Sequence, residues 1–210
     1  MYFLMRVKPI SLLLLSYFCL TFSQAQQTSY TLSEESSFSI KGKTNVSDWT
    51  ITTSEINHEI SLENDLKSLE DFPKDKPVGD VTFSIPVNSL SSDGGGIMDD
   101  RIKKALKADK HPEIIYLLNR GTLKEITSSK ESTFVVHASG QITLAGIKRR
   151  VEFPIKGQFM DDGLIKLEGV YDMQMTRFSV KPPSAMYGQI QAEDDISVRF
   201  TLTLYPNQRP

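Results

Sequence analysis

Apolar and polar residues alternate with a period of two along most of this chain, the pattern of β-strands with one buried face. In "STFVVHASGQITLAGI" the apolar face runs through the even positions from Phe134 to Leu144, and His137, Ser139 and Gln141 occupy the other face. Similar runs occur at 81–87, 151–155, 165–173 and 196–204. The pattern predicts about eight strands, some of ten residues or more.

Short turn signals separate these runs, among them Asn119-Arg120-Gly121, Gly146 and Asp161-Asp162-Gly163. Short connections imply that neighbouring strands pair antiparallel. Long strands with one apolar face favour a closed barrel or a curled sheet over a flat sandwich, because closure leaves no exposed edge. The stretch 67–77 is expected to be a surface loop.

One stretch, "MDDRIKKALKADKHPEIIYLL" (98–118), has a different pattern. Met98, Ile102, Ala105 and Leu106 share one face of a helix, and acids precede lysines as a helix start favours. We predict an amphipathic helix of two to three turns, ended by His111-Pro112, with its apolar side toward the barrel. The strand that follows is apolar on both faces, so Ile115 and Leu117 are expected to need cover as well.

The first 25 residues have the pattern of a signal peptide. Arg6 and Lys8 precede an apolar core from Ile10 to Phe22, and Ser23-Gln24-Ala25 ends in a small residue at each position that a signal peptidase reads. The apolar run is short for a membrane span, which needs roughly 20 residues. We predict cleavage after Ala25, an exported protein, and one domain over 26–210.

Composition limits the chemistry of this domain. The only cysteine, Cys19, lies in the predicted leader, so disulfides and thiolate sites are excluded from the remainder. The formal net charge is −2 and no basic block is present, which argues against nucleic-acid binding. His58, His111 and His137 lack metal-ligand spacing.

No enzymatic motif is visible. The chain has no nucleophile elbow and no phosphate-binding loop, and Gly94-Gly95-Gly96 is interpreted as a flexible connection. The adjacent carboxylates at 99–100, 161–162 and 194–195 fall at turns and a helix start, where solvated acids are expected rather than a catalytic pair. We therefore predict no metal, no cofactor and no enzyme. An eight-stranded barrel can be filled by side chains or can hold one small ligand, and composition does not decide between the two.

Four segments, in order, resemble the YceI-like family of exported lipid-binding proteins. They are "IKGKTNVSDWTI", "MDDRIKKALKADKHPEIIYLL", "SGQITLAGIKRRVEFPI" and "MTRFSVKPPSAMYGQIQAEDDISVRFTLTL", which together cover nearly the whole chain after the leader. The resemblance implies an all-β fold, an extended eight-stranded antiparallel barrel of lipocalin-like architecture with one short helix. It also implies a periplasmic location and a long apolar ligand of polyisoprenoid or similar type. Tyr116 departs from the family pattern, which has an apolar aromatic more often at this position.

The leading hypothesis is non-catalytic binding of a polyisoprenoid, isoprenoid quinone or fatty-acid type of ligand inside the barrel, for transport, storage or stress response. The large side chains of the inward faces are the candidate ligand contacts, with Tyr116 and Tyr171 as candidate polar contacts. The full set is Phe38, Ile40, Trp49, Phe83, Ile85, Ile102, Leu106, Ile114, Tyr116, Phe134, Val136, Ile142, Leu144, Phe153, Leu167, Tyr171, Met173 and Phe200.

Two alternatives stay open. The first is a structural or protein-interaction module of the cell envelope with a solid core. The second is an envelope hydrolase or isomerase that uses an unrecognised carboxylate. No stable membrane span and no nucleic-acid partner are expected, and the oligomeric state is left open, with a homodimer among the options.

Overall fold

The computed structural model describes residues 28–62, 66, 68–71, 78–128 and 132–207. The predicted leader lies outside these residues, and so does most of the predicted loop at 67–77. The described part of that loop includes a short 3-10 turn, η1 (Leu69–Asp71).

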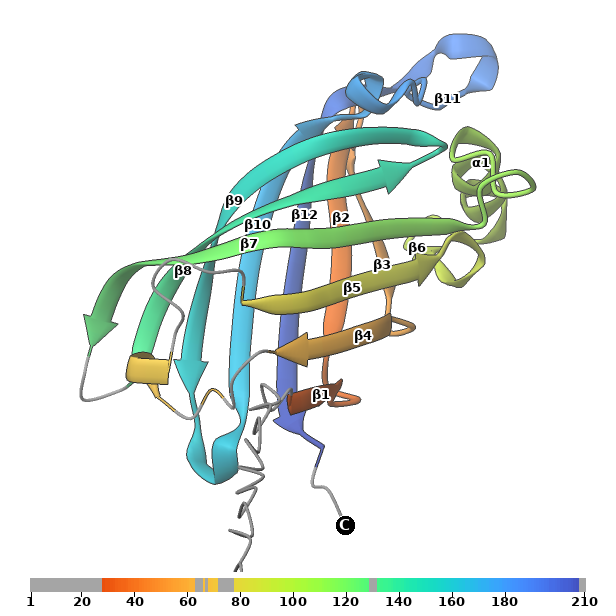
Figure 1. Ribbon diagram of the computed structural model, residues 1–210. Helices are drawn as coiled ribbons and strands as arrows, with labels where there is room; N and C mark the ends of the chain where they lie inside the picture. Colours follow the sequence, from red (N-terminus) through yellow and green to blue (C-terminus); the bar gives the residue numbers. More distant parts are fainter. Residues whose placement is uncertain (1–27, 63–65, 67, 72–77, 129–131, 208–210) are drawn as a thin grey trace, which may run out of the picture.

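The described residues form antiparallel strands that curl into a barrel, with one α-helix at one end (Figure 1). The strands are β1 (Thr28–Leu32), β2 (Ser37–Thr44), β3 (Asp48–Thr53), β4 (Asn57–Leu62), β5 (Gly79–Pro86), β6 (Ser91–Ser92), β7 (Glu113–Ser128), β8 (Thr133–Leu144), β9 (Ile147–Phe159), β10 (Ile165–Gln174), β11 (Ser184–Ala185) and β12 (Ile190–Pro206). The helix is α1 (Gly96–Ala105), and further 3-10 turns are η2 (Val87–Ser89), η3 (Asp161–Gly163), η4 (Met175–Phe178) and η5 (Met186–Gly188).

The pairing order closes the ring. Strands β1, β4, β5, β7, β8, β9, β10 and β12 pair in that order, and β12 pairs with β1. Further along the barrel, toward α1, β12 pairs with β2, β2 with β3, and β3 with β6. Three positions of the ring are therefore each filled by two strands with a break between them: β1 and β2, β4 and β3, and β5 and β6. The structure therefore confirms the predicted closed eight-stranded antiparallel barrel with one helix.

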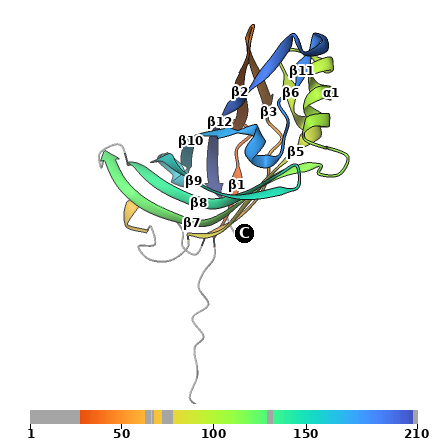
Figure 2. The ribbon, with the colours of Figure 1, turned by 90° about the horizontal axis from the view of Figure 1, so that it is seen from above.

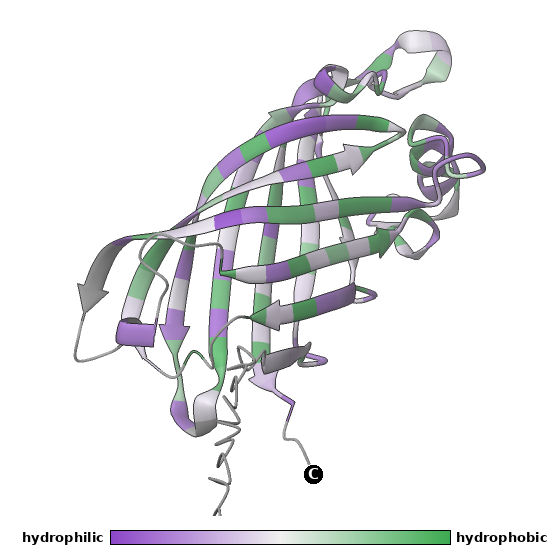
Figure 3. Cartoon of the chain, viewed as in Figure 1, coloured by the Kyte–Doolittle hydropathy of each residue, from purple (hydrophilic) through white to green (hydrophobic). Residues whose placement is uncertain are grey.

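Alternation along the strands creates the apolar interior, as the banding of hydropathy in Figure 3 shows. In β8 the even positions from Phe134 to Gly140 are buried and the odd positions are half-buried. In β9 burial falls on Val151, Phe153 and Gly157. The predicted inward faces of β5, β8, β9, β10 and β12 are all found in the barrel's apolar clusters or on its inner lining.

A bulge in β7 changes which side chains point inward. The register with β8 shifts between Leu118 and Arg120, so the interior passes from Tyr116 and Leu118 to Gly121. On the outer face Leu117 is 41% exposed. The expectation that Leu117 is covered is therefore wrong, because nothing packs over the outside of the barrel at this point among the described residues.

Helix α1 closes one end of the barrel, but it ends earlier than the sequence predicts. Lys107 adopts left-handed backbone (φ 56°), and the Ala108 N–H bonds to the Lys103 carbonyl, the arrangement of a Schellman cap. The helix thus stops at Ala105, six residues before His111. Its predicted apolar face is correct, since Ile102 is buried and Met98 and Leu106 pack on the same cluster.

The helix is fixed to the neighbouring strand by one carboxylate. Asp99 accepts hydrogen bonds from the Ser92 backbone N–H (2.7 Å) and the Ser92 hydroxyl (2.6 Å). Both bonds lower the pKa of Asp99, and the bond from the hydroxyl has the larger effect. At the helix start Gly95 has a φ of 74°, a conformation that glycine adopts without steric cost.

Candidate ligand-binding site

The barrel encloses a cavity of about 270 Å³ whose lining is almost entirely apolar. Three clusters of buried apolar residues each contribute side chains to this lining. One cluster lies at the end nearest β1, one at mid-barrel around Phe153, and one beneath α1. The cavity therefore follows the length of the barrel rather than sitting at one end.

Strand β8 gives a measure of this length. Its residues line the cavity from Phe134 to Leu144, ten positions apart. At a rise of about 3.4 Å per residue this stretch of strand is roughly 34 Å long, and the tilt of barrel strands makes the distance along the barrel axis shorter. A long and narrow apolar space suits an extended hydrocarbon chain better than a compact ligand.

Glycines in the wall leave room for the large aromatic side chains of the lining. A Cβ added to Gly42 would lie 2.1 Å from the Trp49 ring, and one added to Gly157 would lie 2.2 Å from the Phe134 ring. In both cases the ring belongs to the residue directly paired with the glycine on the neighbouring strand. The rings lie against the wall where a side chain would otherwise stand.

The same arrangement recurs at mid-barrel. The Phe200 ring covers its paired residue Gly169, and the Tyr116 ring covers Gly140 from a diagonal position. Because these rings lie over glycine backbone, they contribute apolar surface to the cavity without projecting as far into it.

Four aromatic side chains form a belt around the middle of the cavity. The Phe153 ring centroid lies 5.8 Å from that of Tyr116, 5.3 Å from that of Tyr171 and 6.1 Å from that of Phe200. These separations fall in the range of favourable aromatic pairs. The belt is contributed by β7, β9, β10 and β12, and we call this level of the barrel the waist.

Two polar atoms of the lining residues are buried without a hydrogen-bond partner in the described part of the chain. They are the Tyr116 hydroxyl and the indole Nε1 of Trp49. Burial raises the pKa of Tyr116 well above its ordinary value, so the phenol stays neutral. Both groups can donate a hydrogen bond.

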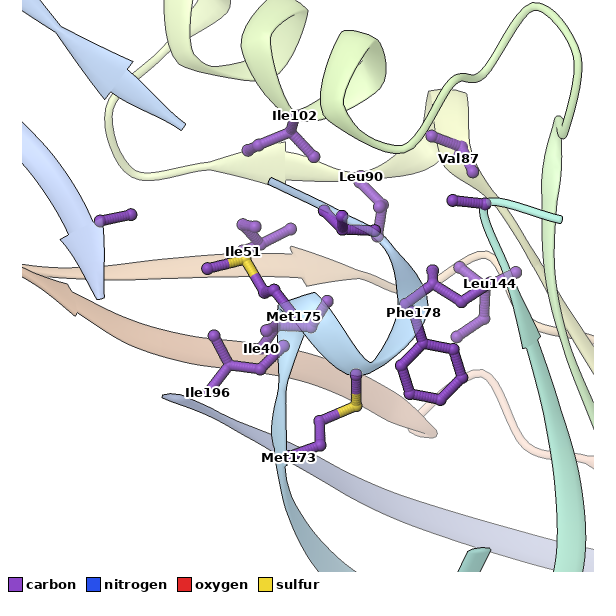
Figure 4. Close-up of a cluster of buried hydrophobic side chains, with 14 of the residues drawn as sticks. Ile40, Ile51, Val87, Leu90, Ile102, Leu144, Met173, Met175, Phe178 and Ile196 are labelled. Carbon is purple, nitrogen blue, oxygen red and sulfur yellow. The ribbon is translucent and has the colours of Figure 1, made fainter. Parts of the chain in front are cut away.

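The end of the cavity under α1 is sealed by a compact cluster. In Figure 4, Ile102 points from α1 toward Leu90, Ile51 and Met175, while Phe178 packs beside Leu144. The η4 turn that carries Met175 and Phe178 is held to β12 by Asp194, which accepts from the Thr176 N–H (2.8 Å) and its hydroxyl. The helix and the η4 turn together form the cap.

All but one of the residues predicted from the sequence as ligand contacts line this cavity. The exception is Ile85, which is buried in the cluster under the cap, outside the lining. Whether the lining residues contact a ligand stays a prediction.

Several lining residues escaped sequence reasoning. They include Ile51, Ile56, Ile60, Leu62, Leu66, Val78, Gly121, Met175, Val180 and Pro183. Strand β3 buries odd positions and β4 even ones, because the short break between Thr53 and Asn57 changes the parity. Reading each of these strands by itself would have found Ile51, Ile60 and Leu62.

The described residues offer little chemistry besides apolar contact. No group of three or more His, Cys, Asp or Glu side chains in the described ranges could hold a metal ion. Among the helices in those ranges, none is long and apolar enough to cross a membrane. His111 packs against Gly146 at the β8–β9 turn, and His58 bonds to the Leu32 backbone N–H (3.2 Å) at the wall of the barrel.

Comparison with known proteins gives one family match. Residues 23–204 match the model of the YceI-like domain. No curated protein matches the chain.

Solved structures share the fold at low sequence identity. The polyisoprenoid-binding domain from Saccharophagus degradans, implicated in plant cell wall breakdown, is 12% identical, with a TM-score of 0.64 over 85% of this chain and 99% of that one. BcnA of Burkholderia cenocepacia is 16% identical, with a TM-score of 0.60 over 82% and 99%. The YceI protein of Campylobacter jejuni is 13% identical, with a TM-score of 0.54 over 76% and 85%. At these identities the likeness establishes the fold alone.

Proposed function

Since this chain belongs to the YceI-like family and its barrel encloses a long apolar cavity, we propose that it binds a lipid-like molecule without chemical conversion. The ligand is a long apolar or amphiphilic chain of the polyisoprenoid, isoprenoid quinone or fatty-acid type. The similar fold of a polyisoprenoid-binding domain supports this choice of ligand class. We further propose that the protein is exported to the periplasm, on the strength of the leader-like residues 1–25.

The shape and lining of the cavity carry the proposal. An apolar chain placed along the barrel would leave water along its whole length, and each buried methylene contributes about 0.8 kcal/mol. Ten such groups would contribute about 8 kcal/mol before the cost of association is subtracted. With few polar atoms in the lining, this burial supplies most of the affinity and little discrimination between chains of similar girth.

Tyr116 and Tyr171 are the proposed polar contacts at the waist. The Tyr116 hydroxyl has no partner in the described part of the chain, and a turn of its ring away from Gly140 would bring this donor to an oxygen of the ligand. No charged side chain lines the cavity, so an ionised group within it would stay uncompensated. A charged head group is therefore expected to remain outside the barrel.

Organic extraction of the purified protein, followed by mass spectrometry, tests the proposal. We expect a long-chain lipid in the extract, and uptake of isoprenoid quinones or fatty acids by the extracted protein. A clean extract without any uptake would contradict ligand binding and favour the alternative of an envelope interaction module.

A blocking substitution makes the test specific to the cavity. Val198 lines the cavity and is only half-buried in the lipid-free barrel, so Val198→Phe adds bulk inside it. We expect uptake to fall at least tenfold. Overpacking should lower the free energy of unfolding by at most about 3 kcal/mol. Val170→Phe makes the same change on the outer face, where Val170 is 45% exposed, and is expected to leave uptake unchanged. Equal uptake by both variants would place the ligand elsewhere.

A further inference from the structure

Large apolar side chains project from the capped end of the barrel, by which we mean α1 and the connections beside it. In the antiparallel ring, the β2–β3 turn, segment 93–112, the β8–β9 turn and segment 175–189 all lie at this end, and Figures 1 and 2 show α1 beside β11. Tyr187 is fully exposed, and Met186, Val46 and Ile97 are 65%, 65% and 75% exposed. They sit on three different connections, so they form separate tips rather than one groove.

The most prominent tip, Met186–Tyr187, is held outward by the fold. Both residues have left-handed backbone, with φ values of 48° and 53°, which is unfavourable for side chains of this kind. The loop is nevertheless anchored, because the Asn45 side chain donates to the Gln189 carbonyl (2.8 Å) and accepts from the Gln191 N–H (3.0 Å). Asn45 also precedes Val46, so the two tips are fixed relative to each other.

Two of the connections at this end carry an excess of positive charge. Segments 93–112 and 175–189 contain seven Lys and Arg and four Asp, a net charge of +3 in a chain whose formal net charge is −2. Lys104, Lys107 and Lys110 are exposed, and so are Asp93, Asp100 and Asp109, which are already counted in this net charge. At the adjoining strand ends, the basic run 148–150 of β9 is balanced by the acidic run 193–195 of β12.

We propose that the capped end docks on a lipid bilayer containing anionic lipids, with Met186 and Tyr187 entering the interface and the lysines contacting the head groups. An exposed tyrosine and methionine on one connection, with exposed lysines on another connection at the same end, match the interfacial zone of a bilayer, where aromatic rings and cationic side chains are both favoured. The docked end is the one that α1 caps, so the bilayer would lie over the helix and the η4 turn.

Vesicle flotation tests this docking. The protein is recovered after export, its N-terminus is verified by intact mass, and it is mixed with phosphatidylcholine vesicles with or without phosphatidylglycerol. We expect co-flotation with the anionic vesicles, weaker binding to the neutral ones, and a loss of about fivefold for each lysine removed in Lys104→Gln and Lys110→Gln.

The double variant Met186→Asn, Tyr187→Asn removes the tip, and asparagine tolerates its left-handed backbone. We expect it to lose at least tenfold in vesicle binding. Met160→Asn, Tyr205→Asn is the matched control, since it removes an exposed Met and Tyr near the opposite end of the barrel. Absent flotation of the unaltered protein, or equal losses in tip and control variants, would overturn the docking and leave the tips to a protein partner.

This docking goes beyond the proposed ligand binding, and the two fail separately. Flotation is scored on lipid-extracted protein, so it does not depend on cavity content. Protein that carries extractable lipid but does not float would retain the proposed function and refute only the docking.

Discussion

At the scale of single residues, the inner wall combines apolar side chains with two polar groups that are unpartnered among the described residues, of which the Tyr116 hydroxyl is one. The Tyr116 hydroxyl is covered by protein atoms and has no partner in the described part of the chain. A buried polar group without a hydrogen bond costs stability, typically about 1–3 kcal/mol. Tyr116 therefore weakens the lipid-free barrel, which fits a residue whose hydroxyl contacts a ligand.

Tyr116→Phe removes this hydroxyl and keeps the ring over Gly140. We expect the free energy of unfolding of the lipid-free protein to rise by about 1 kcal/mol, measured by urea denaturation. Tyr205→Phe, at a position 39% exposed, should change it little. A loss of stability in Tyr116→Phe would mean that the barrel itself supplies a partner for the hydroxyl.

The raised pKa of Tyr116 adds a pH dependence to the same comparison. Its folded-state pKa lies above the unfolded value of about 10. The free energy of unfolding is therefore unaffected by its titration below pH 10 and falls as the pH rises further, because the unfolded chain loses the proton first. Between roughly pH 9 and 11 the unaltered protein should lose more stability than Tyr116→Phe. Parallel curves for the two proteins would contradict a buried phenol.

At the scale of elements, the sequence predicted the strands better than their breaks. Alternation identified the faces of β5, β8, β9, β10 and β12, because a strand that faces a core on one side must alternate. It did not reveal the bulge after Leu118, because one extra residue in a strand shifts the pairing without changing the kinds of residue present. It also did not reveal that the buried positions change from odd in β3 to even in β4. The end of α1 was misplaced for a related reason, because a left-handed lysine can stop a helix as effectively as a proline.

The attachment of α1 to β6 is open to a direct test. Asp99→Ala removes the acceptor of both Ser92 hydrogen bonds, so we expect the cap to loosen and a bound fluorescent fatty acid to dissociate faster in stopped flow. Asp100→Ala, the exposed neighbour, is the control and should behave as the unaltered protein. Identical rates for the two variants would show that this carboxylate does not hold the cap.

Acid should act in the same direction as Asp99→Ala. Because the pKa of Asp99 is lowered in the folded protein, its hold on Ser92 is present above the ordinary value of about 3.9 and fades as the pH falls through the folded-state value. Dissociation should therefore accelerate at acidic pH in the unaltered protein and change less in Asp99→Ala.

At the scale of the whole molecule, the antiparallel ring separates the two proposed activities along one axis. The interior provides a continuous apolar space, and the connections at the capped end collect the helix, the exposed tips and the excess positive charge. The closed barrel and nearly all candidate contacts were predictable from alternation and family resemblance. Alternation alone did not predict the hollow interior, which only the resemblance implied, because the space depends on how rings such as Phe134 and Phe200 lie against facing glycines.

Those wall glycines also set which chains the barrel can accept. A Cβ at Gly169 would lie 2.1 Å from the Phe200 ring, so Gly169→Ala must push the ring inward and reduce the bore of the channel. A methyl-branched isoprenoid chain has a larger cross-section than a straight acyl chain. We expect Gly169→Ala to reduce uptake of the branched chain more than that of the straight one, measured by competition between the two. The calibre of the channel would then be set by residues that lie beneath the lining rings and do not themselves line the cavity.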